Sequence, residues 1–319
     1  MNGHESTERA LAVSRMLKGR LKGGLEEGIP LSGFTSFRIG GPADVLIMPK
    51  GREDLALLSQ TIVEEGADFL VIGKGTNLLV SDDGFRGVVV FLARGMRRIR
   101  VKNKCEVEVE AGCNLNKLIR HCAEHGMSGL EELYGIPGSV GGAVRMNAGA
   151  RGLSFGERVK EIRLLRLGEG SVKEINLGRR EAGFAYRDAR GVGEWDIIYE
   201  VLIELEQGGR EISQKKCEDA MSWRRENQPL DQPSAGSVFL NPEGRAAGEI
   251  IERCGLKGAR VGEAMVSPRH ANFIVNLGNA SAEDVRRLIR RIKEEVLRKE
   301  GVELREEIRM VGFPGGEEG

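Results

Sequence analysis

The chain lacks the features that would place it at a membrane or on nucleic acid. No stretch approaches the roughly 18 to 20 apolar residues that a membrane helix requires, and the first residues contain no apolar core of a signal peptide. Lysine plus arginine (48) equals aspartate plus glutamate (48), without a long run of one sign. Broad attraction to nucleic acid or to anionic lipid is therefore not expected. We expect a cytoplasmic protein without nucleic-acid or membrane partners.

Cysteine and histidine are scarce, and their spacing argues against disulfides and metal centres. The five cysteines are an odd number and form no Cys-x-x-Cys pair, so neither a disulfide framework nor a zinc site is indicated. We expect reduced thiols that mainly fill the core. His121 and His125 have a helical spacing that could hold a metal, but no third ligand is evident, and surface histidines are the alternative. We predict no metal site.

The order of apolar segments predicts mixed α and β structure. A length of 319 residues leaves room for about two or three domains, each with its own core. Loosely helical spacing predicts a helical arm from Glu8 to Leu25. An apolar run ending at Met48 predicts a strand, Asp54 to Gly66 a helix, and Phe69 to Ile72 a buried strand. Strand, helix and strand in this order indicate a small βαβ-like unit.

A glycine-rich segment follows that last strand directly. It reads Gly73-Lys74-Gly75-Thr76-Asn77-Leu78-Leu79. Its glycines let the backbone approach an anion closely, while Thr76 and Asn77 add neutral hydrogen-bond donors. The spacing fits neither the dinucleotide-binding Gly-x-Gly-x-x-Gly pattern nor the P-loop. An ordinary tight turn remains the alternative.

A second segment, residues 135–150, is even richer in small residues, and its only charge is Arg145. Such a segment lets the backbone wrap around a large flat ligand or its pyrophosphate, and a structural loop that supports a domain interface is the alternative. Before it, alternation over Val107 to Ala111 predicts a strand, and periodic apolar residues from Asn114 to Gly126 predict a helix.

Three polar side chains from distant segments suggest chemistry. Arg187 closes a Gly-Phe-Ala-Tyr-Arg turn, Ser237 lies in a loop between a glycine and two large apolar residues, and Glu307 lies in a short strand pattern. A guanidinium, a hydroxyl and a carboxylate are what acid catalysis beside a substrate carboxylate needs. For Glu307 the alternative is an exposed strand residue that pairs with Arg305 or Arg309.

The patterns in the C-terminal third predict helices and a strand that form a structural scaffold. Gly244 to Cys254 predicts a short helix, and His270 to Asn276 predicts a strand. His270 could touch a substrate, although a structural histidine is the alternative. From Ser281, a capping box with Asp284 begins an amphipathic helix that continues to Gly301.

The two glycine segments, in this order and separation, resemble the FAD-binding domain of the vanillyl-alcohol oxidase and para-cresol methylhydroxylase flavoproteins. The C-terminal motifs narrow this resemblance to the family of UDP-N-acetylenolpyruvoylglucosamine reductases, and the short stretch after Arg187 resembles its compact second type. The resemblance extends from Phe34 to Gly312. The motifs that carry it are residues 35–41, 73–79, 135–142, Tyr186-Arg187, residues 233–239 and Glu307-Ile308-Arg309.

The resemblance implies a fold, two cofactors and a reaction. The fold is α+β, with a two-part FAD-binding domain of mixed sheets, residues 1–93 and 94–207. A C-terminal α+β substrate domain, residues 208–319, completes the fold. For the last strand, membership of the FAD domain is the alternative. FAD would be noncovalent, NADPH would donate electrons, and a UDP-sugar would be the small-molecule substrate of a monomeric enzyme. The reaction moves a hydride from NADPH to FAD and then to the vinyl carbon of an enolpyruvyl ether.

The resemblance also assigns roles to residues. Arg187 would bind the substrate carboxylate, and Ser237 would protonate the ether-bearing carbon. Glu307 would be protonated or share a proton, so that it assists rather than repels the enolate-like species, and a raised pKa is expected for it. Tyr186 and Asn241 match positions that contact the substrate, and the alternative for Asn241 is a simple turn former. The residues expected at FAD are Gly73, Lys74, Gly75, Thr76, Asn77, Leu78, Gly138, Ser139, Gly141, Gly142, Ala143 and Asn147.

The sequence departs from the family at two lysine positions near Ser237, which are occupied here by Asn227 and Leu240. Arg224 and Arg225 are the candidates to supply the missing charge, and we expect Arg225 to contact the substrate. Two rival functions are another FAD oxidoreductase of the same superfamily and a noncatalytic module that binds a nucleotide sugar or phosphate. The first rival would have no use for the three polar side chains, and the second would be colourless.

Overall fold

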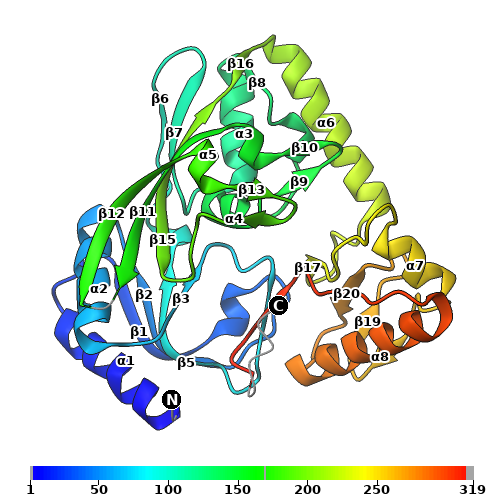
Figure 1. Cartoon of the computed structure of the whole chain (residues 1–319), viewed down its shortest axis with the longest axis horizontal. Helices are drawn as coiled ribbons and strands as arrows, with labels where there is room; N and C mark the ends of the chain where they lie inside the picture. The colour runs from blue at the N-terminus through cyan, green and yellow to red at the C-terminus, as the bar shows by residue number, and fades with distance from the viewer. Residues whose placement is uncertain (1–2, 169, 314–319) are drawn as a thin grey trace. The chain divides into compact units, whose positions relative to one another are not determined.

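The computed structural model describes residues 3–168 and 170–313, and it divides the chain into two compact units (Figure 1). Unit 1 comprises residues 3–28, 44–74 and 86–222 of the described chain, and unit 2 comprises residues 29–43, 75–85 and 223–313. Each unit therefore combines segments that lie far apart in the sequence. The finer predicted division of the first part at residue 93 stays a prediction.

Unit 1 is built on two sheets. A four-stranded sheet has the order β1-β2-β5-β3, and a five-stranded antiparallel sheet has the order β12-β11-β15-β7-β6. The strands are β1 (Gly24–Pro30), β2 (Pro42–Met48), β3 (Phe69–Ile72), β5 (Phe85–Phe91), β6 (Ile99–Val101), β7 (Glu106–Glu110), β11 (Val159–Gly168), β12 (Ser171–Gly178) and β15 (Asp196–Glu204). The helices are α1 (Gly3–Leu17), α2 (Arg52–Glu65), α3 (Leu115–Glu124), α4 (Val140–Arg145) and α5 (Arg179–Ala182).

Short elements complete unit 1, and α6 crosses from one unit into the other. Figure 1 shows α2 beside β11 and β12, against which it packs. The short strand pairs are β8 (Met127–Ser128) with β16 (Glu206–Gln207), β9 (Gly149–Ala150) with β10 (Leu153–Ser154), and β13 (Phe184–Ala185) with β14 (Asp188–Ala189). The long helix α6 spans Arg210–Asn227.

Unit 2 contains a four-stranded antiparallel sheet and one parallel pair. The sheet order is β17-β20-β19-β18, and β21 pairs in parallel with β4. Helix α8 packs on β18, on β19 and on α7. The elements are β4 (Leu78–Val80), β17 (Ser234–Ser237), α7 (Ala247–Arg253), β18 (Arg260–Val261), β19 (Ala264–Val266), β20 (Phe273–Asn276), α8 (Ala282–Glu300) and β21 (Arg309–Val311).

Hydrophobic burial explains why these elements form. In α8, apolar residues that recur at helical spacing are buried and give unit 2 much of its core, namely Val285, Leu288, Ile289, Ile292 and Val296. Burial of one such side chain stabilises the fold by about 1.5–3 kcal/mol. The predicted capping box is confirmed, because Ser281 Oγ accepts from Asp284 N at 3.0 Å and Ser281 N donates to Asp284 Oδ2 at 3.1 Å.

The α+β prediction is confirmed, with two corrections and one addition at the level of single elements. The predicted helical arm from Glu8 to Leu25 is wrong in its bounds: α1 covers Gly3–Leu17, and Gly19 then adopts a left-handed φ of 75° that ends the helix. The small-residue segment, for which no helix or strand was predicted, contains α4, which Ser139 caps. The loop expected around Ser237 contains β17.

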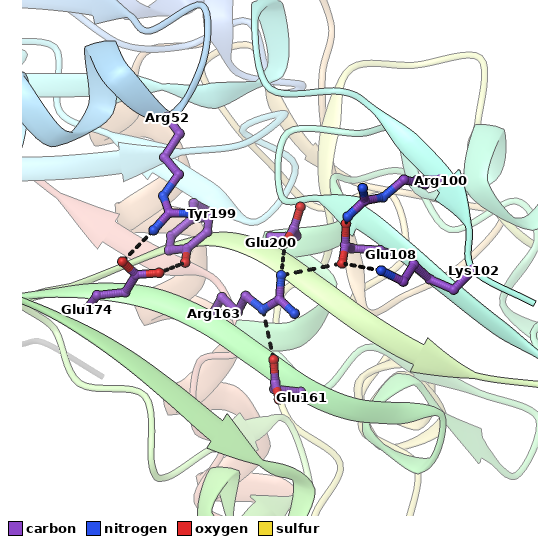
Figure 2. Close-up of polar contacts among 9 residues, drawn as sticks. All are labelled: Arg52, Arg100, Lys102, Glu108, Glu161, Arg163, Glu174, Tyr199 and Glu200. Atoms are coloured by element: carbon purple, nitrogen blue, oxygen red, sulfur yellow. Dashed lines mark hydrogen bonds and ion pairs between the residues drawn. The ribbon is translucent and has the colours of Figure 1, made fainter.

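A network of charged side chains lies on the five-stranded sheet (Figure 2). Glu108 on β7 is only 4% exposed and lies among Arg100, Lys102 and Arg163. Arg163 on β11 also bonds Glu161 at 2.8 Å and pairs with Glu200. The network therefore connects β6, β7, β11 and β15 through side chains in addition to the backbone ladder.

Neighbouring cations hold the pKa of the Glu108 carboxyl below its ordinary value of 4.5. Burial alone would raise this pKa, but the hydrogen bond from Arg100 and the surrounding positive charges outweigh burial and lower it. Since the folded-state pKa lies below that of the unfolded chain, the ionised carboxylate stabilises the fold fully above about pH 4.5. This contribution is lost as the pH falls through the folded-state value.

We predict that Glu108→Gln lowers the free energy of unfolding by about 1–2 kcal/mol at neutral pH, because two or three cations lose their partner. The difference from the parent protein should shrink as the pH falls below about 4.5, where the carboxylate itself becomes neutral. Urea unfolding at several pH values measures both effects. Glu211→Gln, which changes an exposed glutamate of α6, is the control, and an equal effect of both changes would contradict the prediction.

Candidate active site

The two predicted glycine segments meet in unit 1. A Cβ atom on Gly73 would lie 1.9 Å from Ser139 Oγ, so only glycine fits where the first segment contacts the second. Ser139 is buried, and its hydroxyl accepts from Gly142 N at 3.3 Å, which caps α4. The amide of Gly141 donates to Ala111 O at 2.8 Å, which anchors the second segment beyond the end of β7.

The first glycine segment continues into unit 2. Gly75 has a φ of 58°, and a Cβ atom there would lie 2.1 Å from Phe34 O, so this turn also requires glycine. Asn77 then connects the segment to the end of the chain. Its Nδ2 donates to Glu307 O at 3.0 Å, and its main-chain oxygen accepts from Arg309 N at 3.0 Å. The segment expected at FAD is therefore fixed to the strand that follows Glu307.

Ser237 and Glu307 lie on adjoining backbone segments of unit 2. The β17–β20 pairing shifts register between Ser234 and Ser237, and Gly236 within this shift has a left-handed φ of 79°. Such a bulge bends a strand and redirects a side chain. Directly after it, Val238 O accepts from Glu307 N at 2.7 Å. One backbone hydrogen bond thus connects the residue next to Ser237 with Glu307 itself.

Arg187 belongs to unit 1 and lies in a strained turn. It occupies the second position of the two-residue turn between β13 and β14, with a φ of 56° that disfavours any residue with a Cβ atom. Its Nη1 donates to Gly149 O at 3.1 Å, and its guanidinium lies 5.5 Å from the ring centre of Tyr186. Such strain persists where the surrounding structure imposes it, often at functional sites.

Asn147, which was predicted to contact FAD, also belongs to unit 1 and stabilises this turn through hydrogen bonds. Its Nδ2 donates to Ala185 O at 2.7 Å, and its Oδ1 accepts from Gly156 N at 2.9 Å. Tyr186 at the tip of the turn is 59% exposed, an unusual state for a large aromatic side chain. The turn therefore presents Tyr186 and Arg187 from a backbone that is held on both sides.

The remaining predicted residues have varied surroundings within their own units. Leu78 and Ala143 are buried, and Lys74 is exposed. Asn241 Oδ1 accepts from Ala247 N at 3.0 Å at the start of α7. Near the end of α6, Arg225 is exposed whereas Arg224 is buried. The predicted contacts of Gly138 and Thr76 with FAD remain predictions. The same holds for all the catalytic and substrate-binding assignments.

The cysteines and histidines have no arrangement that suits catalysis or metal binding. Burial raises the pKa of the Cys113 thiol to about 11 and that of the Cys122 thiol to about 12, so both are protonated near neutral pH. The rings of His121 and His125 lie 4.2 Å apart. Among residues 3–168 and 170–313, no three histidine, cysteine, aspartate or glutamate side chains form a metal-binding group. The helices of these same residues include none with the length and apolar character needed to cross a membrane.

Two segments of the chain match models of known protein families. Residues 43–176 match the model of an FAD binding domain. Residues 228–311 match the C-terminal domain of UDP-N-acetylenolpyruvoylglucosamine reductase. The first match includes both glycine segments completely. Together with the α+β fold, it defines the chain as a flavoprotein of the FAD-binding class.

Individual relatives narrow this class to one family. The UDP-N-acetylenolpyruvoylglucosamine reductase of Heliobacterium modesticaldum is 43% identical over 90% of this chain and 91% of its own length. That of Caldanaerobacter subterraneus is 42% identical over 94% and 99%. The crystal structure of the Thermus caldophilus reductase is 35% identical, with a TM-score of 0.78 over 92% of this chain and all of that one. The chain belongs to the UDP-N-acetylenolpyruvoylglucosamine reductase family, which confirms the predictions of family, enzyme class and FAD.

The left-handed turn at Arg187 makes a prediction about stability. Arg187→Gly and Arg187→Ala both remove the guanidinium and its bond to Gly149 O, but only alanine keeps the Cβ atom in the strained conformation. We expect the glycine variant to be more stable than the alanine variant by about 1 kcal/mol. Urea unfolding of the two variants measures this difference, and equal stabilities would show that the turn is not strained.

Proposed function

We propose that the chain reduces UDP-N-acetylenolpyruvoylglucosamine to UDP-N-acetylmuramate in peptidoglycan synthesis, and that Arg187, Ser237 and Glu307 carry out the chemistry at the substrate. Bound FAD would supply the hydride chemistry between NADPH and the terminal vinyl carbon of the enolpyruvyl ether. The observation that carries the assignment is the 2.7 Å hydrogen bond from Glu307 N to Val238 O, next to Ser237. It holds two groups suited to proton transfer in one unit.

Arg187 would bind the substrate carboxylate. Addition of a hydride to the vinyl carbon pushes negative charge toward this carboxylate and gives an enolate-like species. A guanidinium keeps its charge at any working pH and can bind a carboxylate through two parallel hydrogen bonds. Its hold would strengthen as the charge grows, and interactions that are stronger in the transition state lower the barrier.

Glu307 would act as a hydrogen-bond donor, and Ser237 would act as a proton donor. A protonated Glu307 would donate a hydrogen bond to the enolate, whereas an ionised one would repel it. Ser237 Oγ–H would give its proton to the ether-bearing carbon, which completes the saturated product. Serine is a weak acid, so this step requires a strongly basic carbon and a polar surrounding for the oxygen left behind. Arg225 is the proposed cation near the substrate, and Tyr186 and Asn241 are proposed substrate contacts.

The residues on the chain fit a noncovalent FAD. Gly73 and Ser139 are in contact within unit 1, and the tight backbone at Gly75 excludes a side chain. Neutral donors such as Thr76 and backbone amides suit phosphate oxygens without a large positive charge, in keeping with the zero formal net charge. We propose Lys74 and Gly142, both exposed, as further contacts of the cofactor.

We also propose that the enzyme works as a monomer in the cytoplasm, with small molecules as its partners and no nucleic acid or membrane. All five cysteines are free thiols, as expected in a reducing compartment. The equal numbers of acidic and basic residues give no basis for attraction to a polyanion.

The purified protein should be yellow, and this colour tests the reaction directly. We predict that NADPH bleaches the flavin absorbance near 450 nm under anaerobic conditions, with about one equivalent per enzyme. Addition of the enolpyruvyl UDP-sugar should then restore the colour, because reduced flavin passes its electrons to the substrate. A colourless protein would favour the noncatalytic binding module, and a flavin that bleaches but ignores this sugar would favour another oxidoreductase.

Ser237→Ala separates the two halves of this titration. The variant should bleach with NADPH at the parent rate, since Ser237 takes no part in reduction of the flavin. Its reoxidation by substrate should be slower by on the order of 10²- to 10⁴-fold, the usual effect of losing a proton donor. Stopped-flow absorbance measures both rates. Ser234→Ala on the same strand is the control, and unchanged reoxidation in Ser237→Ala would remove Ser237 from the mechanism.

A further inference from the structure

We propose that Asn272 is a positioning residue for the catalytic step because its side chain fixes the backbone that carries Ser237; the inference rests on the role proposed for Ser237 above. Asn272 lies directly before β20 and is only 4% exposed. Its Nδ2 donates to Phe239 O at 2.8 Å, and its Oδ1 accepts from Phe239 N at 2.9 Å. In addition, Asn272 O accepts from Val238 N at 2.8 Å.

These contacts replace a backbone ladder at the point where it ends. β17 stops at Ser237 after its register shift, so the next two residues lie outside its regular pairing with β20. The carboxamide of Asn272 offers one donor and one acceptor side by side, as a peptide unit does. It therefore pairs with Phe239 as a neighbouring strand would and holds the chain beyond Ser237 in register.

The same stretch is tied to Glu307 from its other side. Val238 N donates to Asn272 O, while Val238 O accepts from Glu307 N at 2.7 Å. Val238 thus lies between the Asn272 and the Glu307 backbones, with Ser237 as its immediate neighbour. A shift of this stretch would change the separation between the Ser237 hydroxyl and the Glu307 carboxyl. Misplacement of a reacting group by about 1 Å can cost on the order of 100-fold in rate.

Burial makes the effect of losing the side-chain amide specific and local. Phe239 is 1% exposed and Val238 is 1% exposed, so water cannot replace the lost partner without movement of the chain. Only a side chain of this length with both a donor and an acceptor satisfies Phe239. Leucine has a similar size but neither group, and an ionised aspartate would place an acceptor against the Phe239 carbonyl.

Asn276, the last residue of β20, provides a matched control. It is 3% exposed, its Nδ2 donates to Phe37 O at 3.0 Å, and its Oδ1 accepts from Gly278 N and Ala280 N. Asn276→Leu therefore removes a comparable set of buried hydrogen bonds from β20 without touching the Ser237 stretch. A purely structural role of either asparagine predicts a loss of thermal stability in both variants, with no difference between them in chemistry.

The experiment measures both half-reactions in holoenzyme by stopped-flow absorbance. Asn272→Leu should be bleached by NADPH at the parent rate, whereas its reoxidation by the enolpyruvyl UDP-sugar should be slower by on the order of 10- to 100-fold. Asn276→Leu should leave both rates within about twofold of the parent. The expected loss in Asn272→Leu lies in kcat for reoxidation rather than in KM, since the change leaves the proposed substrate contacts in place.

Asn272→Asp adds a pH-dependent rescue and carries the test if the leucine variant does not fold. A protonated aspartate has one donor and one acceptor and can reproduce both bonds to Phe239, and burial favours this neutral form. Its reoxidation rate relative to the parent protein at the same pH should therefore rise as the pH falls from about 8 to about 5.5. A ratio that stays constant with pH would contradict the proposed pairing.

The outcomes separate this inference from the proposed function. If the reduced parent protein is not reoxidised by the sugar, the proposed function itself fails. If the parent and Ser237→Ala behave as expected but Asn272→Leu reacts like Asn276→Leu, only the inference about Asn272 fails. Slow reoxidation in Asn272→Leu together with unchanged reoxidation in Ser237→Ala would overturn the route through Ser237.

Discussion

The hydrogen bond between Glu307 N and Val238 O is the interaction on which the candidate active site depends. It joins the C-terminal strand region to the bulged end of β17, and the parallel pairing of β21 with β4 adds the glycine segment through Asn77. These three segments are far apart in sequence, so their contacts form only when unit 2 folds as a whole. The stability of unit 2 and the alignment of Ser237 with Glu307 are therefore coupled.

Much of this site is made from backbone that regular secondary structure does not supply. Gly236 and Arg187 adopt left-handed conformations, and Gly73 contacts Ser139 too closely for a side chain. Glycine adopts such conformations without a steric cost, whereas for Arg187 the conformation is costly and persists because surrounding hydrogen bonds and packing impose it. Asn147 and Asn272 provide such bonds in their respective units, each through a carboxamide that donates to one backbone group and accepts from another.

The sequence predicted those parts that local patterns encode. Apolar spacing and a capping box located α8, and ordered motifs located both glycine segments, Arg187 and Glu307. The role of Asn272 left no such signal in the sequence. Its partner Phe239 lies 33 residues away, and a polar residue before a strand is common. The predicted arm from Glu8 to Leu25 ran past Gly19 for a similar reason: weak periodicity could not show where the backbone turns.

Within each unit, hydrogen bonds hold the backbone that carries the proposed reacting groups. The carboxylate contact proposed for Arg187 needs two hydrogen bonds, and its turn is held within unit 1 by the bonds of Asn147 to Ala185 O and Gly156 N. Proton transfer likewise needs heavy atoms within hydrogen-bond reach. Ser237 and Glu307, the two proposed proton-handling groups, lie in the same unit, and their chain neighbours Val238 and Ile308 belong to its hydrophobic core. The backbone beside each of these proposed reacting groups is thus held by hydrogen bonds inside its own unit.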